Sequence, residues 1–322
     1  MMIQKIIITG SGGMVGKNLT DALNTLKNYK VFPTYYDITI PRNDTESVNN
    51  IINTYTFLNI LNREALEDIF TRIKPDIIIH LAAQSRPDIS ISRPIDTVET
   101  NLFGTINISE SSWVKINKPW IINFSSSAVY GDINWKYPAN ENSATKPITA
   151  YGVSKLSAER YLHSNYEGIC TSLRLFNCSG PYKTSDLISD ICKRLNFEDD
   201  RSLKIGNIDS KRHFLHVSDV VEAVKKLLSL ENEKRIEFNR EFNLAPTHKH
   251  LHKVTDIIFE FENILGHKLN LINDKNLYRS KDEKLIWGDS NLLSSMLGWS
   301  SKKNIKDIVK DSFIYSKKIR KK

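Results

Sequence analysis

Tyr151 and Lys155 are the residues of this sequence whose types and spacing have the clearest chemical meaning. The segment around them is predicted to be helical, and residues four apart lie on one face of a helix. An ammonium group beside a phenol favours the phenolate, so we expect it to lower the phenol pKa from about 10. The pair therefore predicts a tyrosine that acts as a general acid or base near neutral pH.

Three serines, Ser125, Ser126 and Ser127, end a short apolar strand predicted over residues 120–124. In an open α/β sheet, ligands bind at the carboxyl ends of the strands. A hydroxyl group there can hydrogen-bond a substrate oxygen that gains or loses a proton. The serines could instead only satisfy the backbone of a turn, but their presence in one chain with the Tyr-Lys pair favours a catalytic site.

A glycine-rich turn joins the first predicted strand (residues 3–9) to the first predicted helix (14–28). Gly10 permits the tight turn, Gly13 lets the backbone approach a pyrophosphate, and Gly16 lets the helix pack closely on the strand. Free N–H groups and the helix dipole favour anionic phosphates at this end of the helix. The turn therefore predicts a dinucleotide cofactor.

Asp37 ends the second predicted strand, about twenty residues after the glycine turn. A carboxylate at this place accepts hydrogen bonds from the adenosine ribose and repels a 2′-phosphate. Asp37 therefore favours NAD(H). Arg42 leaves NADP(H) open, because its side chain can reach back if the loop folds over.

Strand-like and helix-like segments alternate in the first two-thirds of the chain, which predicts a parallel sheet with helices on both faces. The polar residues 37–56 are predicted to form a loop. The expected strands are 3–9, 31–36, 76–80, 120–124 and 169–175, and the expected helices are 14–28, 66–73, 94–116 and 150–166. We therefore predict an α/β fold of the Rossmann type, a doubly wound parallel sheet.

The pattern loosens after about residue 176, which suggests a smaller C-terminal α/β domain for the substrate. We expect a cofactor domain over 1–176, with return segments near 212–246, and a mainly substrate-binding domain over 177–322. The expected helices of this part are 184–196, 217–229, 250–265 and 304–317, and the expected strands are 203–205 and 241–245.

Composition and charge favour a cytoplasmic protein that binds a small molecule. The net charge of +8 falls to +3 without the five basic residues of the last seven, which are expected to form a frayed tail. We therefore expect no nucleic-acid partner. No apolar run is long enough for a membrane span or a signal peptide, so no membrane partner is expected either. The three cysteines, Cys170, Cys178 and Cys192, are expected to be reduced thiols.

Three alternating histidines, His248, His250 and His252, raise the question of a metal site. We recognise no carboxylate or cysteine beside them, so we interpret them as part of a polar loop and expect no metal.

The sequence resembles the extended short-chain dehydrogenase/reductase family in its nucleotide-sugar branch, the NAD-dependent epimerases and dehydratases. The resemblance lies in TGSGGMVG at the glycine turn, HLAAQS at 80–85, Asn101 to Thr105, SSSAVYG, YGVSK and RLFNCSGP at 174–181. Ser179 and Asn62 depart from the family, where a tyrosine and an aspartate are usual.

The resemblance implies roles for individual residues. Ser126 and Tyr151 become catalytic, with Tyr151 as the proton donor, and Lys155 lowers its pKa and binds the nicotinamide ribose. The expected cofactor-binding residues are Gly10, Gly13, Met14, Val15, Asp37, Leu81, Ala82, Ala83, Asn101, Tyr151 and Lys155.

Two segments, 203–224 and 279–299, resemble GDP-mannose 4,6-dehydratases and GDP-4-dehydro-6-deoxy-mannose reductases. By position, their arginines and Asn177 should contact the nucleotide diphosphate or ribose, because a guanidinium binds phosphate bidentately. The alternative is that these arginines are surface residues. The expected substrate-binding residues are Ser126, Ser127, Asn177, Arg212 and Arg279.

The reaction is narrowed by the two residues after Ser126. A 4,6-dehydratase needs a further acid and base, and relatives carry a carboxylate at one of these positions, where this chain has Ser127 and Ala128. A C4 keto-reductase or a 4-epimerase of the UDP-hexose type remains. A non-enzymatic NAD-binding scaffold would be expected to have lost the catalytic residues. Relatives pair through helices corresponding to 94–116 and 150–166, so a homodimer is expected.

Overall fold

A seven-stranded parallel sheet forms the centre of the structure, a computed structural model that describes residues 3–132, 137–198, 202–206, 208, 211–248, 250–274 and 285–320. In spatial order the strands are β11 (Glu241–Leu244), β6 (Cys170–Leu175), β5 (Trp120–Ser126), β4 (Ile77–His80), β1 (Gln4–Thr9), β2 (Tyr29–Tyr35) and β3 (Thr56–Phe57). All neighbouring pairs are parallel. The chain order reverses between β1 and β4, which is the crevice where ligands bind in such sheets. The predicted Rossmann-type fold is confirmed.

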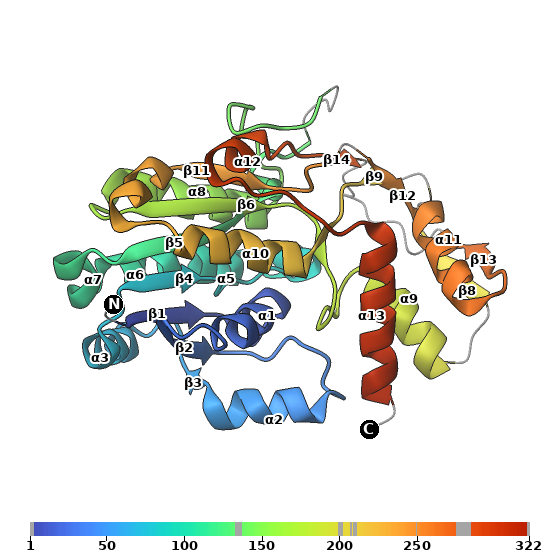
Figure 1. Cartoon of the computed structure of the whole chain (residues 1–322), viewed down its shortest axis with the longest axis horizontal. Coiled ribbons are helices and arrows are strands. Elements are labelled where there is room, and N and C mark those ends of the chain that lie inside the picture. The colour runs from blue at the N-terminus through green and yellow to red at the C-terminus, as the bar shows by residue number, and fades with distance from the viewer. Residues whose placement is uncertain are drawn as a thin grey trace.

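Helices cover both faces of this sheet because consecutive strand residues point to opposite sides. Ile6 and Ile8 lie in one apolar cluster and Ile7 lies in another. The first face is covered by α1 (Met14–Leu23) and α10 (Val217–Leu228), and the second by α3 (Arg63–Ile73), α6 (Gly104–Glu110), α7 (Ser112–Asn117) and α8 (Ala150–Asn165). Figure 1 shows the sheet between these layers.

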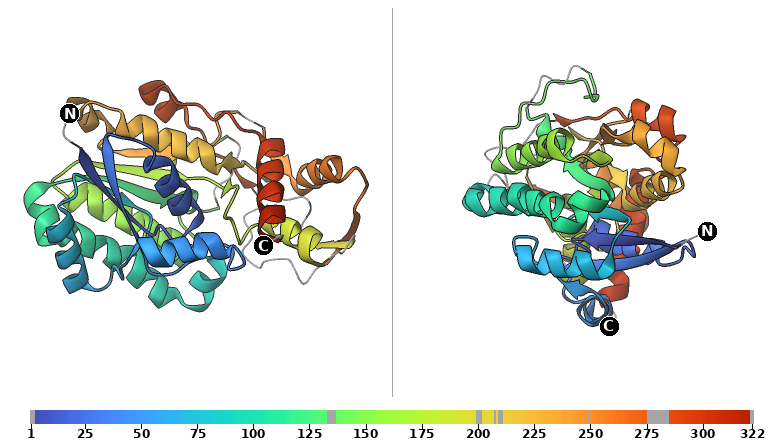
Figure 2. Two further views of the ribbon diagram at one scale, coloured as in Figure 1. Left: turned by 60° about the horizontal axis from the view of Figure 1, so that its bottom comes forward. Right: turned by 90° about the vertical axis from the view of Figure 1, so that its left-hand side faces the viewer.

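A second apolar core lies beside the sheet, and its helices and strands follow residue 186. It is built from α9 (Leu187–Lys193), β8 (Ser202–Ile205), α11 (Val254–Leu265) and α13 (Ile305–Arg320). The exposed strand β13 (Asn270–Asn273) pairs with β8. In Figure 1 and in the left view of Figure 2, α13 stands between this unit and the large sheet. The division of the chain at residue 176 stays a prediction. β11 and α10 pack with the large sheet and lie within the return segments expected near 212–246.

Short elements connect these two parts. The small sheets pair β7 (Cys178–Ser179) with β10 (Leu215–His216), and β9 (Lys211–Arg212) with β12 (His252–Lys253) and β14 (Leu285–Ile286). The remaining helices are α4 (Pro87–Ser92), α5 (Pro94–Val98), α12 (Asn291–Leu297), the π-helices η1 (Glu99–Phe103) and η3 (Arg194–Glu198), and the 3₁₀ helices η2 (Ser127–Val129) and η4 (Asn232–Phe238).

The prediction of a loop over residues 37–56 is wrong, because the helix α2 (Thr45–Thr54) forms there. Asp44 caps this helix by accepting a hydrogen bond from the Ser47 N–H at 3.3 Å. Ile51 is fully buried against Ile38 and Ile40. A cap and a single apolar anchor therefore outweigh the polar composition of the segment.

The single helix predicted over 94–116 is divided into α5, η1, α6 and α7. The helix ends at Ser111, whose backbone is extended (φ −62°, ψ 145°) and whose hydroxyl donates to the Ile108 carbonyl at 3.0 Å. The predicted helix 250–265 begins only at Val254, because His252 and Lys253 pair with β9.

The prediction of a frayed basic tail is also wrong for the residues up to Arg320, because the helix α13 continues to that residue. Ile319 is 6% exposed, so the helix packs to its end. Lys321 and Lys322 lie outside the described residues. Within the described part of the chain, none of the helices combines the length and apolar character that crossing a bilayer requires.

Candidate active site

The glycine turn places the N-terminus of α1 at the crevice between β1 and β4. Gly10 has φ +77°, and a Cβ atom there would lie 2.6 Å from the Ala82 backbone nitrogen. A Cβ on Gly16 would lie 2.5 Å from the Gly10 carbonyl oxygen. The sequence analysis did not single out Gly12, where an added Cβ atom would clash with the Asp37 carbonyl. The turn is therefore held against the ends of β2 and β4, where a pyrophosphate can approach the backbone.

A buried histidine fixes the loop after β4, which carries Leu81, Ala82 and Ala83. The Thr105 hydroxyl donates to the Asn101 carbonyl at 2.7 Å, so it accepts from His80 Nε2 at 2.9 Å. His80 Nδ1 then accepts from the Thr9 hydroxyl at 2.8 Å. Burial lowers the pKa of His80 to about 3, so this ring is neutral.

Asn101 clamps the same loop onto α8. Its Oδ1 accepts from the Gln84 N–H at 2.7 Å, and its Nδ2 donates to the Gln84 carbonyl at 3.1 Å and to Ser154 Oγ at 2.9 Å. Ser154 in turn donates to the Tyr151 carbonyl at 2.8 Å. The amide donors of Asn101 are thus used within the protein, and its predicted contact with the cofactor stays a prediction.

Asp37 and Arg42 face each other at the end of β2. Arg42 Nη2 lies 3.2 Å from Asp37 Oδ1, and both side chains are about two-thirds exposed, at 69% for the arginine and 66% for the aspartate. The loop has therefore folded back as the sequence allowed. The same place offers a carboxylate for a ribose and a guanidinium for a phosphate.

Ser126 and Tyr151 come together from β5 and α8. Ser126 is 8% exposed and its Oγ accepts from the Ala128 N–H at 3.2 Å. Burial raises the pKa of the Tyr151 phenol, and a hydrogen bond with Ser126 lowers it only in part. The net rise contradicts the expected lowering by Lys155, because burial penalises the phenolate more strongly. The phenol is therefore protonated at neutral pH.

Lys155 lies on the same helix and is 4% exposed. Burial lowers its pKa to about 8, and the carboxylate of Glu159 counteracts this. Among the described residues, none forms a hydrogen bond or ion pair with the ammonium group. The buried ammonium group can donate three hydrogen bonds and has no acceptor in the described part of the protein. It could therefore donate to the hydroxyl oxygens of a ribose.

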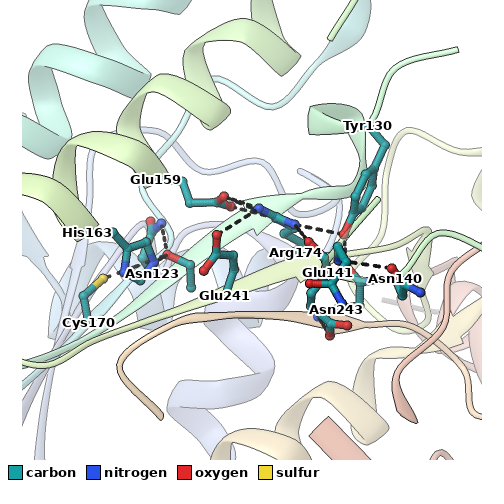
Figure 3. Close-up of polar contacts among 12 residues, drawn as sticks. Asn123, Tyr130, Asn140, Glu141, Glu159, His163, Cys170, Arg174, Glu241 and Asn243 are labelled. Carbon is teal, nitrogen blue, oxygen red and sulfur yellow. Dashed lines mark hydrogen bonds and ion pairs between the residues drawn. The ribbon is translucent and has the colours of Figure 1, made fainter. Parts of the chain in front are cut away.

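Glu159 belongs to a buried polar network that sequence reasoning missed (Figure 3). Arg174 is 1% exposed and donates from Nη2 to Glu159 at 2.6 Å and from Nη1 to the Tyr130 hydroxyl at 3.0 Å. The Tyr130 hydroxyl donates to Asn243 Oδ1 at 2.6 Å. The network therefore links α8, β6 and β11 directly behind Lys155. The available signal was a charged residue in a strand whose other residues are uncharged.

Several hydroxyl and amide groups near the ends of β5 and β6 lack partners. The buried atoms without a hydrogen bond include Ser125 Oγ, Asn177 Nδ2 and Ser179 Oγ. Such groups require an explanation, and a bound polar ligand is one. Asn177 was predicted to bind substrate, and its orphaned amide fits that role.

For the other predicted substrate residues, the described part of the structure gives no such sign of a ligand contact. Ser127 is partly buried at the start of η2. Arg212 lies in β9, where its Nη1 donates to the Lys211 carbonyl at 3.0 Å. Arg279 lies outside the described residues. The catalytic roles of Ser126, Tyr151 and Lys155 and the nucleotide contacts therefore stay predictions.

The residues present fit an NAD(P) cofactor. Gly10 and Gly13 leave the start of α1 open, the 80–83 loop is fixed beside them, and Lys155 offers unpartnered donors. The exposed Asp37–Arg42 pair stands at the end of β2, where the adenosine ribose is expected.

Comparison with known proteins gives matches along the whole chain. The family model for GDP-mannose 4,6 dehydratase matches residues 7–312. GDP-6-deoxy-D-mannose reductase of Pseudomonas aeruginosa is 27% identical over 320 residues, 95% of this chain and 94% of that protein. A putative UDP-glucose 4-epimerase of Methanocaldococcus jannaschii is 30% identical over 237 residues, 71% of this chain and 74% of that protein.

Solved structures agree with these matches. The structure of RMD from Pseudomonas aeruginosa complexed with NADPH has a TM-score of 0.81 and 25% identity, and the alignment covers 98% of this chain and 99% of that one. Other structures of the same fold contain NAD. The chain therefore belongs to the GDP-mannose 4,6 dehydratase family of extended short-chain dehydrogenases/reductases, and it is an NAD(P)-dependent enzyme of the nucleotide-sugar reductase, dehydratase and epimerase class.

Proposed function

We propose that this enzyme reduces C4 of a GDP-linked 4-keto-6-deoxy-hexose with NAD(P)H. The main support for the proposal is the length of the alignment with GDP-6-deoxy-D-mannose reductase. This alignment covers 95% of the chain and so includes its C-terminal part. The match to the putative UDP-glucose 4-epimerase has higher identity but covers 71% of the chain.

The catalytic residues have the protonation states that a reduction needs. NAD(P)H, when bound at the glycine turn and Lys155, would supply the hydride that C4 accepts. Ser126 and Tyr151 hydrogen-bond the C4 oxygen, and these bonds strengthen as negative charge develops there. Tyr151, whose pKa is raised by burial, then delivers its proton. Lys155 stabilises the phenolate that remains and holds the nicotinamide ribose.

Dehydration finds no support in the residues after Ser126. Elimination of water across C5 and C6 requires an additional acid and base. Ser127 and Ala128 occupy the positions where relatives carry a carboxylate, and neither side chain can transfer that proton.

Epimerisation at C4 is the second candidate, and the Ser-Ser-Ser-Ala string of UDP-galactose-type epimerases favours it. An epimerase must first remove a proton from the C4 hydroxyl, so its tyrosine has to be available as phenolate. The longer match to GDP-6-deoxy-D-mannose reductase, over 95% of the chain, supports the reductase instead.

The cofactor preference, the location and the assembly belong to the same proposal. Asp37 favours NAD(H), and Arg42 keeps NADP(H) in reach. The enzyme acts in the cytoplasm. Two copies pair through the surface that exposes Ile95 (71%), Phe103 (51%) and Val153 (45%), since large apolar groups gathered on a surface mark an interface.

The test offers three substrates separately: GDP-mannose, its 4-keto-6-deoxy derivative and UDP-galactose. We expect the keto sugar alone to consume reduced cofactor, in equal amount to the deoxy-sugar formed. Cofactor absorbance follows the hydride, and NMR of the product identifies the new C4 centre. Release of a keto sugar from GDP-mannose would establish the dehydratase. Interconversion of UDP-galactose without net cofactor oxidation would establish the epimerase.

A further inference from the structure

Three histidines gather where the chain passes from β11 to α11, away from the catalytic residues. His252 belongs to β12 and pairs antiparallel with Arg212 of β9 (Figure 1). The ring centroids of His250 and His252 are 4.6 Å apart, and those of His248 and His252 are 6.1 Å apart.

A carboxylate completes this cluster, contrary to the interpretation as a simple polar loop. Asp256 lies in the first turn of α11, where its Oδ2 accepts from the Lys253 N–H at 2.8 Å. This cap turns the side chain back toward β12. One ligand atom from each of His250, His252 and Asp256 lies within 4.8 Å of the other two.

The surroundings leave lone pairs available. Both ring nitrogens of His248 are buried and have no hydrogen-bond partner among the described residues, which is rare for polar atoms. His252 is 6% exposed. His250 is exposed and gives a cation access from solvent.

We propose that His250, His252 and Asp256 bind a divalent transition-metal cation such as Zn²⁺, with His248 adjacent as a further ligand. Imidazole and carboxylate are ligands that Zn²⁺ accepts, at distances of about 2.0–2.2 Å, so a modest closure of the cluster forms the site. Two imidazoles select against Mg²⁺ and Ca²⁺, which prefer oxygen ligands.

The location gives the cation a structural role. It joins β12 to the first turn of α11, and β12 is hydrogen-bonded to β9, the strand that carries Arg212. The strands of this small sheet are two residues long. A metal that binds only the folded state stabilises that state. The cation would therefore stabilise the small sheet next to Arg212, a proposed nucleotide contact.

The experiment uses the full chain without a histidine tag, treated with a chelator and then dialysed. Isothermal titration with Zn²⁺ alone should give one ion per chain, and Co²⁺ should produce visible absorption bands of a protein-bound ion. His250→Ala and Asp256→Asn should each weaken Zn²⁺ binding at least about tenfold. His267→Ala removes an exposed histidine beyond the other end of α11 and should bind Zn²⁺ like the unmodified chain.

A second measurement excludes misfolding as the cause of a loss. Zn²⁺ should raise the thermal midpoint of the unmodified chain and of His267→Ala, but not of His250→Ala, while all variants bind reduced cofactor equally. The proposal is overturned if Zn²⁺ fails to bind, or if it binds His250→Ala and Asp256→Asn as tightly as the control.

Discussion

The two sides of the proposed active site are built in different ways. On the cofactor side, residues from β1, β4, β5 and β6 are held by a continuous parallel ladder and by buried polar groups such as Arg174 and Glu159. On the substrate side, Arg212 lies in a strand of two residues, paired with strands of the same length.

The difference separates chemistry from specificity. The catalytic groups need fixed positions, and a buried network with satisfied hydrogen bonds provides them. The predicted contacts to the sugar and nucleotide lie on short segments that can vary without disturbing the sheet. We therefore expect the reaction chemistry to depend on the rigid sheet and the choice of sugar to depend on these short segments.

The strongest test of the catalytic side is Tyr151→Phe. The ring is kept and the proton donor is lost, so turnover should fall by about 10²–10⁴ while cofactor binding is retained. Single-turnover kinetics and cofactor fluorescence measure the two effects. Tyr161→Phe is the matched control, because Tyr161 lies on the same helix and its hydroxyl donates to Glu110 at 3.1 Å. Equal activity of both variants would contradict the assignment.

Arg174→Met tests whether the buried network holds the catalytic side. The change leaves Glu159, which is fully buried, without its partner, so the free energy of unfolding should fall by about 3–5 kcal/mol. Urea denaturation followed by circular dichroism measures it. Adding Glu159→Gln should recover part of the loss, because the uncompensated charge disappears.

The exposed neighbour Arg160 supplies the control for that prediction. Arg160→Met should change the free energy of unfolding by no more than about 0.5 kcal/mol. A similar small loss in Arg174→Met would mean that the network contributes little to stability.

The pH dependence should be set by Lys155 rather than by Tyr151. The pKa of Lys155 is lowered to about 8 by burial, whereas that of Tyr151 is raised. Reduction needs both groups protonated, so kcat/KM should stay constant below that pH and fall about tenfold per pH unit above it. Glu159→Gln removes a carboxylate that raises the Lys155 pKa, so its decline should begin at lower pH. A profile that is flat up to the ordinary pKa of lysine would refute this role.

The sequence predicted the large sheet well and singled out candidate catalytic residues for a physical reason. Parallel strands buried on both faces are continuous apolar runs, and a glycine turn or a Tyr-Lys pair depends on neighbours within a few positions. Ser126 and Tyr151 could be considered together because Ser126 follows a predicted strand and Tyr151 lies at the start of a predicted helix. In the structure Tyr151 lies in the first turn of α8, and Ser126 is the side chain that lowers its phenol pKa in part.

The failures share a dependence on tertiary packing. Ile319 was assigned to a frayed tail because its neighbours are basic, but α13 buries it. The pKa of Tyr151 was predicted from Lys155 alone, and burial reversed its direction. Asp256 was overlooked as a partner of the histidines, because a helix cap turns its side chain back toward them. Burial by distant elements and the direction of a capping side chain cannot be predicted from residue spacing alone.

The smallest expected effect concerns Asp37 and Arg42, the exposed pair at the edge of the cofactor side. Asp37→Ala removes acceptors for the ribose and also the repulsion of a 2′-phosphate, so NADH should bind about tenfold more weakly while NADPH does not. Arg42→Ala should weaken NADPH and spare NADH, because only the phosphate needs the guanidinium. Fluorescence titration with both cofactors measures each change, and Asn43→Ala, which alters an exposed and uncharged neighbour, serves as the control. If both cofactors lose affinity equally in Asp37→Ala, the carboxylate shapes the loop and does not select the cofactor.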